Sequence, residues 1–185
     1  MHENEFFIDD AQRHLASYTP ERRQELMKLA QEARDADAKS YRDFFVGCTV
    51  LSVHSGVNGD VEYRAFPAGN YTPERKDRSE IGKWCAERVA VNRALSEGAT
   101  FIPAMVSVSK ESDRGENEHN HGVLHPCPEC RGLLRHLLEE KILHEQTMIC
   151  NVNDHDPQNT IVSEMTLSEL LELYKDDVIN GKFQK

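Results

Sequence analysis

The sequence contains no long apolar run. No stretch of its 185 residues approaches the roughly 20 consecutive apolar residues that a membrane-spanning helix needs. Residues 1–5 are charged and polar, unlike the start of a secretory signal peptide. We therefore expect a soluble, cytoplasmic protein that does not enter a membrane.

Basic residues are scarce relative to acidic ones. The chain has 32 Asp and Glu against 22 Lys and Arg, which leaves a formal net charge of -10. Such a field repels a phosphate backbone unless a local basic patch overrides it. Nucleic acid is therefore an unlikely partner for this chain.

Cysteines are few, and their number is odd. Five cysteines in a cytoplasmic chain do not indicate a disulfide framework. Their spacing is more informative, because Cys127 and Cys130 form a Cys-x-x-Cys pair and Cys85 stands well upstream. Cys48 and Cys150 occupy apolar runs, where a cysteine is usually a small buried hydrophobic residue.

Periodicity and turn residues predict a mixture of helices and strands. The chain length fits one domain spanning residues 1–185, with a helical extension at about 1–19. After it, the pattern predicts a helix at 20–38, a hairpin of 44–53 and 61–66, a helix from 85, a strand at 102–108, a helix from 126, strands at 147–152 and 160–162, and a last helix capped by Thr166 and Glu169. This order predicts an α/β sandwich around a mixed sheet of about five strands.

The three separated cysteines fit a catalytic metal site. Cys85 and the pair Cys127 and Cys130 lie at predicted helix N-termini, where free N–H groups and the helix dipole favour thiolates. Two such helix ends facing each other could hold a zinc ion. Three thiolates leave the fourth tetrahedral position open to water, whereas a structural zinc site is closed by a fourth side chain. The pattern thus indicates Lewis-acid or hydroxide chemistry.

Glu87 follows Cys85 by two positions. In the middle of a helix the two side chains would diverge by about 200°. Both can face one pocket only if Cys85 precedes the helix, as the predicted boundary allows. A carboxylate beside zinc-bound water can take its proton and pass it to a substrate nitrogen, so Glu87 is the candidate general acid and base.

These residues lie in two motifs that resemble a known family. Cys85-Ala86-Glu87-Arg88, followed at 126–131 by Pro-Cys-Pro-Glu-Cys-Arg, is similar to the paired signature of zinc-dependent cytidine deaminases, a family that includes blasticidin S deaminases. Residues 41–47, 94–98 and 165–171 resemble further stretches of the family. The likeness covers residues 22–172.

The resemblance implies a fold, a reaction and an assembly. The family has a three-layer α/β/α fold and usually forms a homotetramer with shared active sites, so a tetramer, or a dimer, is expected here. The implied substrate is a small-molecule nucleoside: cytidine, deoxycytidine or a modified or antibiotic cytosine nucleoside. Zinc on Cys85, Cys127 and Cys130 would activate the hydroxide that attacks C4, while Glu87 protonates N3 and then the leaving ammonia.

Further residues take roles by the same resemblance. Backbone groups at Ala86 and before Cys127 would hold the edge of the base, and Phe44 would line the pocket. Arg88 would offset the charge of the ligand thiolates. Asn70 matches the asparagine with which the family binds ribose.

The chain also departs from the family where the sugar is bound. The family has a glutamate two positions after that asparagine, and here the residue is Thr72. Glu74 could take its place. The neighbouring Arg75, Lys76 and Arg78 could read an anionic group on a modified substrate, although a solvated loop is the simpler interpretation. His125 replaces a small hydroxyl residue, so ordinary cytidine is not the assured substrate.

Several alternatives remain open from the sequence. The zinc site could be closed by His125, Cys48 or Cys150, which would make it structural, and the chain could be a non-catalytic zinc-stabilised binding module. Glu87 at its expected position argues against both. A polynucleotide cytosine deaminase is a third alternative, disfavoured by the net charge of -10 and by the lack of a basic, aromatic-rich groove.

A histidine-rich tract adds one more alternative. His119, His121 and His125 could bind a second metal ion, but they belong to a very polar segment that reads as an exposed insertion.

Overall fold

The computed structural model describes residues 10–40, 44–56, 58–72, 83–110, 122–156 and 158–175. Its centre is a five-stranded sheet in the order β3-β2-β5-β6-β7. The strands are β2 (Val46–Ser55), β3 (Val61–Gly69), β5 (Phe101–Ser109), β6 (Met148–Asn153) and β7 (Ile161–Thr166). β5 and β6 are parallel and the other neighbours are antiparallel, so the sheet is mixed as predicted.

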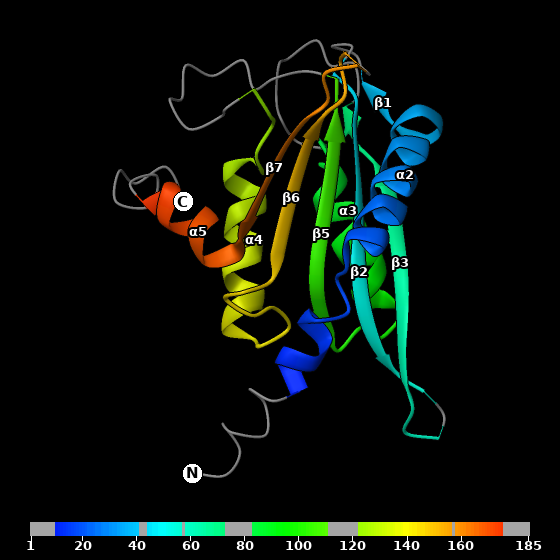
Figure 1. The fold of residues 1–185 in the computed structure, drawn as a ribbon, viewed down its shortest axis with the longest axis vertical. Coiled ribbons are helices and arrows are strands. Elements are labelled where there is room, and N and C mark those ends of the chain that lie inside the picture. Colours follow the sequence, from blue (N-terminus) through cyan, green and yellow to red (C-terminus); the bar gives the residue numbers. More distant parts are fainter. Residues whose placement is uncertain are drawn as a thin grey trace.

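Helices cover both faces of this sheet (Figure 1). On one face α2 (Pro20–Asp37) packs through Leu26 and Ala30 onto apolar residues of β2, β5 and β6. On the other face lie α3 (Ala86–Ser96), α4 (Pro128–Glu139) and α5 (Leu167–Leu173), whose buried residues form a second core with the alternate side chains of the strands. The two cores confirm the expected three-layer α/β/α architecture.

The contact between α2 and the sheet is unusually close. A Cβ at Gly47 of β2 would lie 1.8 Å from the carbonyl oxygen of Ala30, and one at Gly69 of β3 would lie 2.4 Å from the backbone nitrogen of Ala38. Only glycine fits at these two positions, because the nearest neighbours are backbone atoms that cannot rotate away. This approach fixes β2 and the end of β3, which lead into the functional site.

Most element boundaries agree with the sequence-based expectations. The 44–53 and 61–66 runs form the antiparallel pair β2–β3. The capping box predicted at Thr166 and Glu169 begins α5. The strand expected at 160–162 is longer, because β7 pairs with β6 along its whole length from Ile161 to Thr166.

One feature of the fold was not predicted. β1 (Lys39–Ser40) and β4 (Tyr71–Thr72) form a separate two-stranded parallel sheet. Two-residue strands are too short to show an alternating pattern, so the sequence indicated only a polar stretch from 71 onward. Residues 10–15, within the extension expected at about 1–19, are helical, and residues 1–9 lie outside the described ranges. No helix in the described ranges is long and apolar enough to span a membrane.

The parallel pair β5–β6 determines where the helices begin. α4 connects β5 to β6 and therefore runs antiparallel to both, which brings its N-terminus to the carboxyl end of β5. α3 leads into β5 through a short turn and begins at the same edge. In α/β folds, sites form at this edge of the parallel strands.

Candidate metal centre

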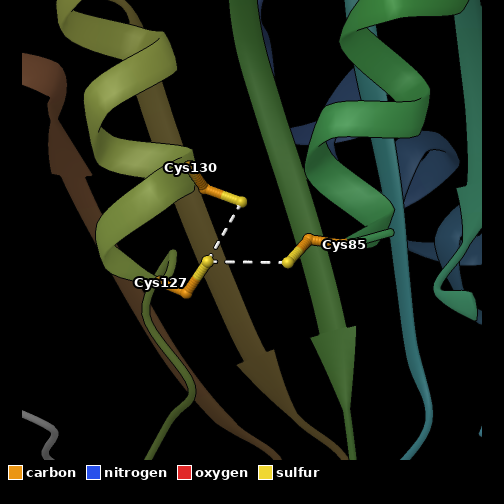
Figure 2. Close-up of side chains that lie close together, drawn as sticks. All are labelled: Cys85, Cys127 and Cys130. Atoms are coloured by element: carbon orange, nitrogen blue, oxygen red, sulfur yellow. Dashed lines mark hydrogen bonds between the residues drawn. The ribbon is translucent and has the colours of Figure 1, made fainter. Parts of the chain in front are cut away.

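Three cysteine sulfurs meet between the first turns of α3 and α4 (Figure 2). Cys127 Sγ lies 3.5 Å from Cys85 Sγ and 3.4 Å from Cys130 Sγ. Zinc–sulfur bonds of about 2.3 Å in tetrahedral geometry place sulfurs about 3.8 Å apart, so the cluster matches the size of one zinc ion. Within the described ranges, no fourth cysteine, histidine or carboxylate lies within 4.8 Å of all three sulfurs, although the exposed Glu129 accepts a hydrogen bond of 3.2 Å from Cys127 Sγ. The donor set therefore fits a zinc ion with one position left for water.

The local backbone explains why the sulfurs converge. Cys85 and Cys127 are the N-cap residues of α3 and α4, and both have extended backbone conformations, with φ and ψ of -69° and 144° for Cys85 and -64° and 166° for Cys127. Neither side chain caps its own helix. Cys85 thus precedes its helix, which is the condition under which Cys85 and Glu87 can share a pocket.

Hydrogen bonds connect the three thiols. Hydrogen bonds from Cys127 and Cys130 lower the pKa of Cys85 to about 4. The same contacts, together with burial, raise the pKa of Cys130. A metal cation stabilises thiolates, so binding one would displace protons from this cluster.

Glu87 is a buried carboxyl at the edge of this cluster. Glu87 is the second residue of α3, and it is 7% exposed. Burial raises its pKa to about 7, and the charge of Cys127 acts in the same direction. A carboxyl with a pKa near neutrality can both accept and donate a proton, as an acid–base catalyst requires.

Asn70 is held at the end of β3 by the backbone opposite it. Its Oδ1 accepts from Val46 N and its Nδ2 donates to Phe44 O, both at 2.9 Å, and the residue is 4% exposed. Asn70 therefore fixes the backbone at Phe44, whose ring packs against the core shared by α3 and α4. A hydrogen bond thus connects Asn70 and Phe44, the two residues that the family resemblance assigned separately to the substrate pocket.

A backbone bridge connects this region to the cysteine cluster. Tyr71 and Trp84 exchange two N–H to O hydrogen bonds of 2.8 Å, which place the residue after Asn70 beside the residue before Cys85. Trp84 is 55% exposed next to the cluster, and nothing in the sequence pattern singled it out. Ala86 is fully buried at the first position of α3. The first backbone hydrogen bond of this helix runs from Val89 N to Cys85 O.

Arg88 is anchored near the cluster through the backbone. Its Nη2 donates to Lys83 O at 2.8 Å, which ties α3 to the segment that leads into Cys85. That Arg88 offsets the negative charge of the ligand thiolates stays a prediction.

Several residues proposed from the sequence lie outside the described ranges, namely Glu74, Arg75, Lys76, Arg78, His119 and His121.

The three other side chains proposed as a closing ligand lie elsewhere. Cys150 is buried on the α2 face of the sheet, the face opposite α3 and α4. Cys48 belongs to the core beneath α3, where burial raises its pKa well above the usual thiol value. His125 shares a hydrogen bond of 2.9 Å with the hydroxyl of Tyr174 through Nδ1. Both cysteines behave as buried hydrophobic residues, as their sequence context predicts.

The comparisons with known proteins agree with this geometry. Residues 20–145 match the family model described as the cytidine and deoxycytidylate deaminase zinc-binding region, a span that includes all three cysteines and Glu87. Cytidine deaminase from Burkholderia pseudomallei aligns with 22% identity over 80% of this chain and 94% of its own, with a TM-score of 0.54. Cytidine deaminase from Mycobacterium leprae aligns with 22% identity over 80% and 95%, with a TM-score of 0.50.

At these identities the solved structures establish the shared fold, and the family model covers more than half of the chain. The chain therefore belongs to the cytidine and deoxycytidylate deaminase family and is a zinc-dependent enzyme of the cytidine deaminase type.

Proposed function

We propose that this enzyme hydrolyses the bond between C4 of the cytosine ring and its exocyclic amino group in a free nucleoside. The reaction releases ammonia and leaves the uracil form. One observation supports the proposal: the buried carboxyl of Glu87 lies close enough to Cys127 and Cys130 to interact with both, beside the three sulfurs that could hold a zinc ion. Catalytic zinc sites have one position open to water, and hydrolysis needs a group that moves protons beside it.

The chemistry divides between the metal and the protein. Zinc held by Cys85, Cys127 and Cys130 would supply a Lewis acid that lowers the pKa of a bound water. Glu87 takes a proton from the attacking water and gives one to N3 of the ring. As the C4–N4 bond breaks, Glu87 takes the second proton of that water from the new hydroxyl on C4 and passes it to the amino nitrogen, which leaves as ammonia, while the oxygen becomes the new carbonyl at C4.

Other residues bind and orient the nucleoside in this proposal. The backbone at Ala86 holds the edge of the base at the start of α3, and Phe44 lines the pocket where Asn70 fixes it. Asn70 and Glu74 are the proposed sugar ligands. Because Asn70 already bonds two backbone groups, only its remaining N–H and lone pair are left for a ribose hydroxyl.

The proposal of a small substrate rests on the net charge of the chain and on its similarity to solved structures. A net charge of -10 disfavours a polynucleotide, and both solved relatives named above are cytidine deaminases. We therefore propose a free nucleoside as the substrate, with cytidine, deoxycytidine and antibiotic cytosine nucleosides as the candidates. We also propose a cytoplasmic enzyme of pyrimidine salvage that assembles as a homotetramer, or as a dimer.

The substrate proposal predicts a clear order of activity. The purified enzyme, given cytidine, deoxycytidine, blasticidin S and a single-stranded oligonucleotide with one cytosine, should deaminate at least one free nucleoside and leave the oligonucleotide unchanged. Mass spectrometry of each product detects the exchange of an amino group for oxygen. Deamination of the oligonucleotide alone would favour the polynucleotide reading, and a zinc-bound protein inactive on every compound would favour a non-catalytic module.

The ligand assignment predicts coupled loss of metal and stability. Cys85→Ala, Cys127→Ala and Cys130→Ala should each lose stoichiometric zinc, together with several kcal/mol of folding free energy, because metal binding at thiolates contributes about 10–16 kcal/mol in small zinc sites. Cys150→Ala is the matched control, since it removes a buried thiol from the opposite face of the sheet. Elemental analysis and chemical denaturation measure both quantities. Full zinc in the three ligand variants would refute the assignment.

The acid–base assignment predicts a difference between two neighbouring carboxyls. Glu129 accepts a hydrogen bond of 3.2 Å from Cys127 Sγ but is exposed, whereas Glu87 is buried. Glu87→Gln should keep zinc and fold and lose at least about 10²–10⁴-fold in kcat, the range that general acid–base groups supply. Glu129→Gln should stay within about tenfold of the wild type. Steady-state kinetics on the best substrate decide between them, and the opposite ranking would make Glu129 the proton carrier.

A further inference from the structure

A single tyrosine from the C-terminal helix contacts both flanks of the second zinc motif. Tyr174 ends α5 and is buried, with 7% exposure. His125 precedes the ligand Cys127 by two positions, and Arg131 directly follows the ligand Cys130. Both are buried as well, with exposures of 3% and 7%. One side chain from the end of the fold therefore reaches both ends of the segment that holds two metal ligands.

The contact before the motif is a hydrogen bond with a defined ring arrangement. Tyr174 Oη and His125 Nδ1 are 2.9 Å apart. Their rings meet edge to face, with centroids 5.8 Å apart and an interplanar angle of 85°. A buried hydrogen bond of this kind fixes the orientation of the imidazole. Because His125 is joined to Cys127 only through Pro126, fixing it restricts the backbone that enters the motif.

The contact after the motif is a cation–π interaction. The guanidinium carbon of Arg131 lies 3.8 Å from the centroid of the Tyr174 ring. The same guanidinium donates through Nη1 to Pro126 O at 2.5 Å. Arg131 thus closes the motif on itself, from the residue after Cys130 back to the residue before Cys127. Its planar, rigid fork can make both contacts at once, which a lysine could not.

Helix α5 is itself firmly placed, so Tyr174 is a fixed support. Thr166 and Glu169 form a complete capping box at its start. Leu167 and Leu170 are fully buried in the core that also contains Leu134 and Leu137 of α4. α5 lies beside α4 in Figure 1.

We propose that Tyr174 is a positioning residue of the metal centre: through His125 and Arg131 it holds the segment from Pro126 to Cys130 in the geometry that zinc binding needs. Groups bonded directly to metal ligands typically change metal affinity 10- to 100-fold when lost, which sets the scale for Tyr174, whose contacts are with the residues that flank the ligands. This inference rests on the zinc site proposed above, and it assigns to the C-terminal helix a role that neither motif contains.

The chain offers a matched control for this contact. Far from the cysteines, Tyr63 Oη and His14 Nδ1 are 3.0 Å apart, and their rings are also edge to face, with centroids separated by 5.9 Å. Tyr63→Phe removes the same chemical group from the same kind of pair. Any general cost of losing a Tyr–His hydrogen bond appears in both variants, and an effect on the metal appears only in the Tyr174 variant.

The test measures how fast zinc leaves the folded full-length protein. Wild type, Tyr174→Phe, Tyr174→Leu and Tyr63→Phe are loaded with zinc and mixed with a chromogenic chelator under conditions where circular dichroism shows each to be folded. Tyr174→Leu, which loses both contacts, should release zinc 10- to 100-fold faster than wild type. Tyr174→Phe, which keeps the ring beneath Arg131, should fall between them, and Tyr63→Phe should match wild type.

Cobalt substitution gives an independent view of the geometry. The visible absorption of Co²⁺ bound to thiolates depends on ligand arrangement, so it should shift in Tyr174→Leu and stay unchanged in Tyr63→Phe. The proposal is overturned if Tyr174→Leu releases zinc as slowly as wild type and its cobalt spectrum is unchanged. If Tyr174→Leu does not fold, the same two results in Tyr174→Phe overturn it. If the proposal fails in this way while the wild-type protein binds zinc and deaminates a nucleoside, the proposed function still holds. A wild type without zinc would refute both.

Discussion

The structure depends on three sulfur atoms that meet where two helices begin. Each helix start supplies extended backbone at its N-cap, which allows Cys85 and Cys127 to turn away from their own helices. The parallel strands β5 and β6 bring these starts to one edge of the sheet. Thiolates so close together repel one another, and a divalent cation removes that repulsion. A zinc ion would therefore stabilise this part of the fold.

The same arrangement gives Glu87 its properties. Because Cys85 precedes α3, the carboxyl two residues later enters the first turn beside the sulfurs and away from water. Burial then raises its pKa to about 7. The helix boundary therefore determines both which cysteines meet and which carboxyl lies beside them, the carboxyl that we propose as the proton carrier. Moving the boundary by one residue would separate the two side chains.

Much of this could be predicted from the sequence. Two short motifs, an alternation of apolar residues in the strands and a capping box at Thr166 predicted the order of elements, the start of α3 and the three cysteines that lie together in the candidate metal centre. These signals are local, because helix caps and ligand spacing depend on neighbours in the chain. The two-residue strands β1 and β4 were not predicted from the sequence, because their pairing is determined by tertiary contacts, which bring Lys39 beside Tyr71.

The contact of Tyr174 with His125 and Arg131 could not have been predicted in the same way. His125 and Tyr174 are 49 positions apart, and nothing in the spacing of α5 distinguishes this tyrosine from an ordinary core residue. Arg131 directly follows the second motif, and the motif itself does not show what its side chain contacts. Its place between Pro126 and the Tyr174 ring appears only when α4 and α5 are packed together.

The central claim is that zinc is held by three cysteines and keeps one position open. Zinc K-edge X-ray absorption of the wild-type protein tests it directly. The account predicts three sulfur neighbours at about 2.3 Å and one oxygen neighbour at about 2.0–2.2 Å. Four sulfur neighbours, or three sulfurs with the scattering pattern of an imidazole ring, would mean that the site is closed by another side chain and would contradict the account.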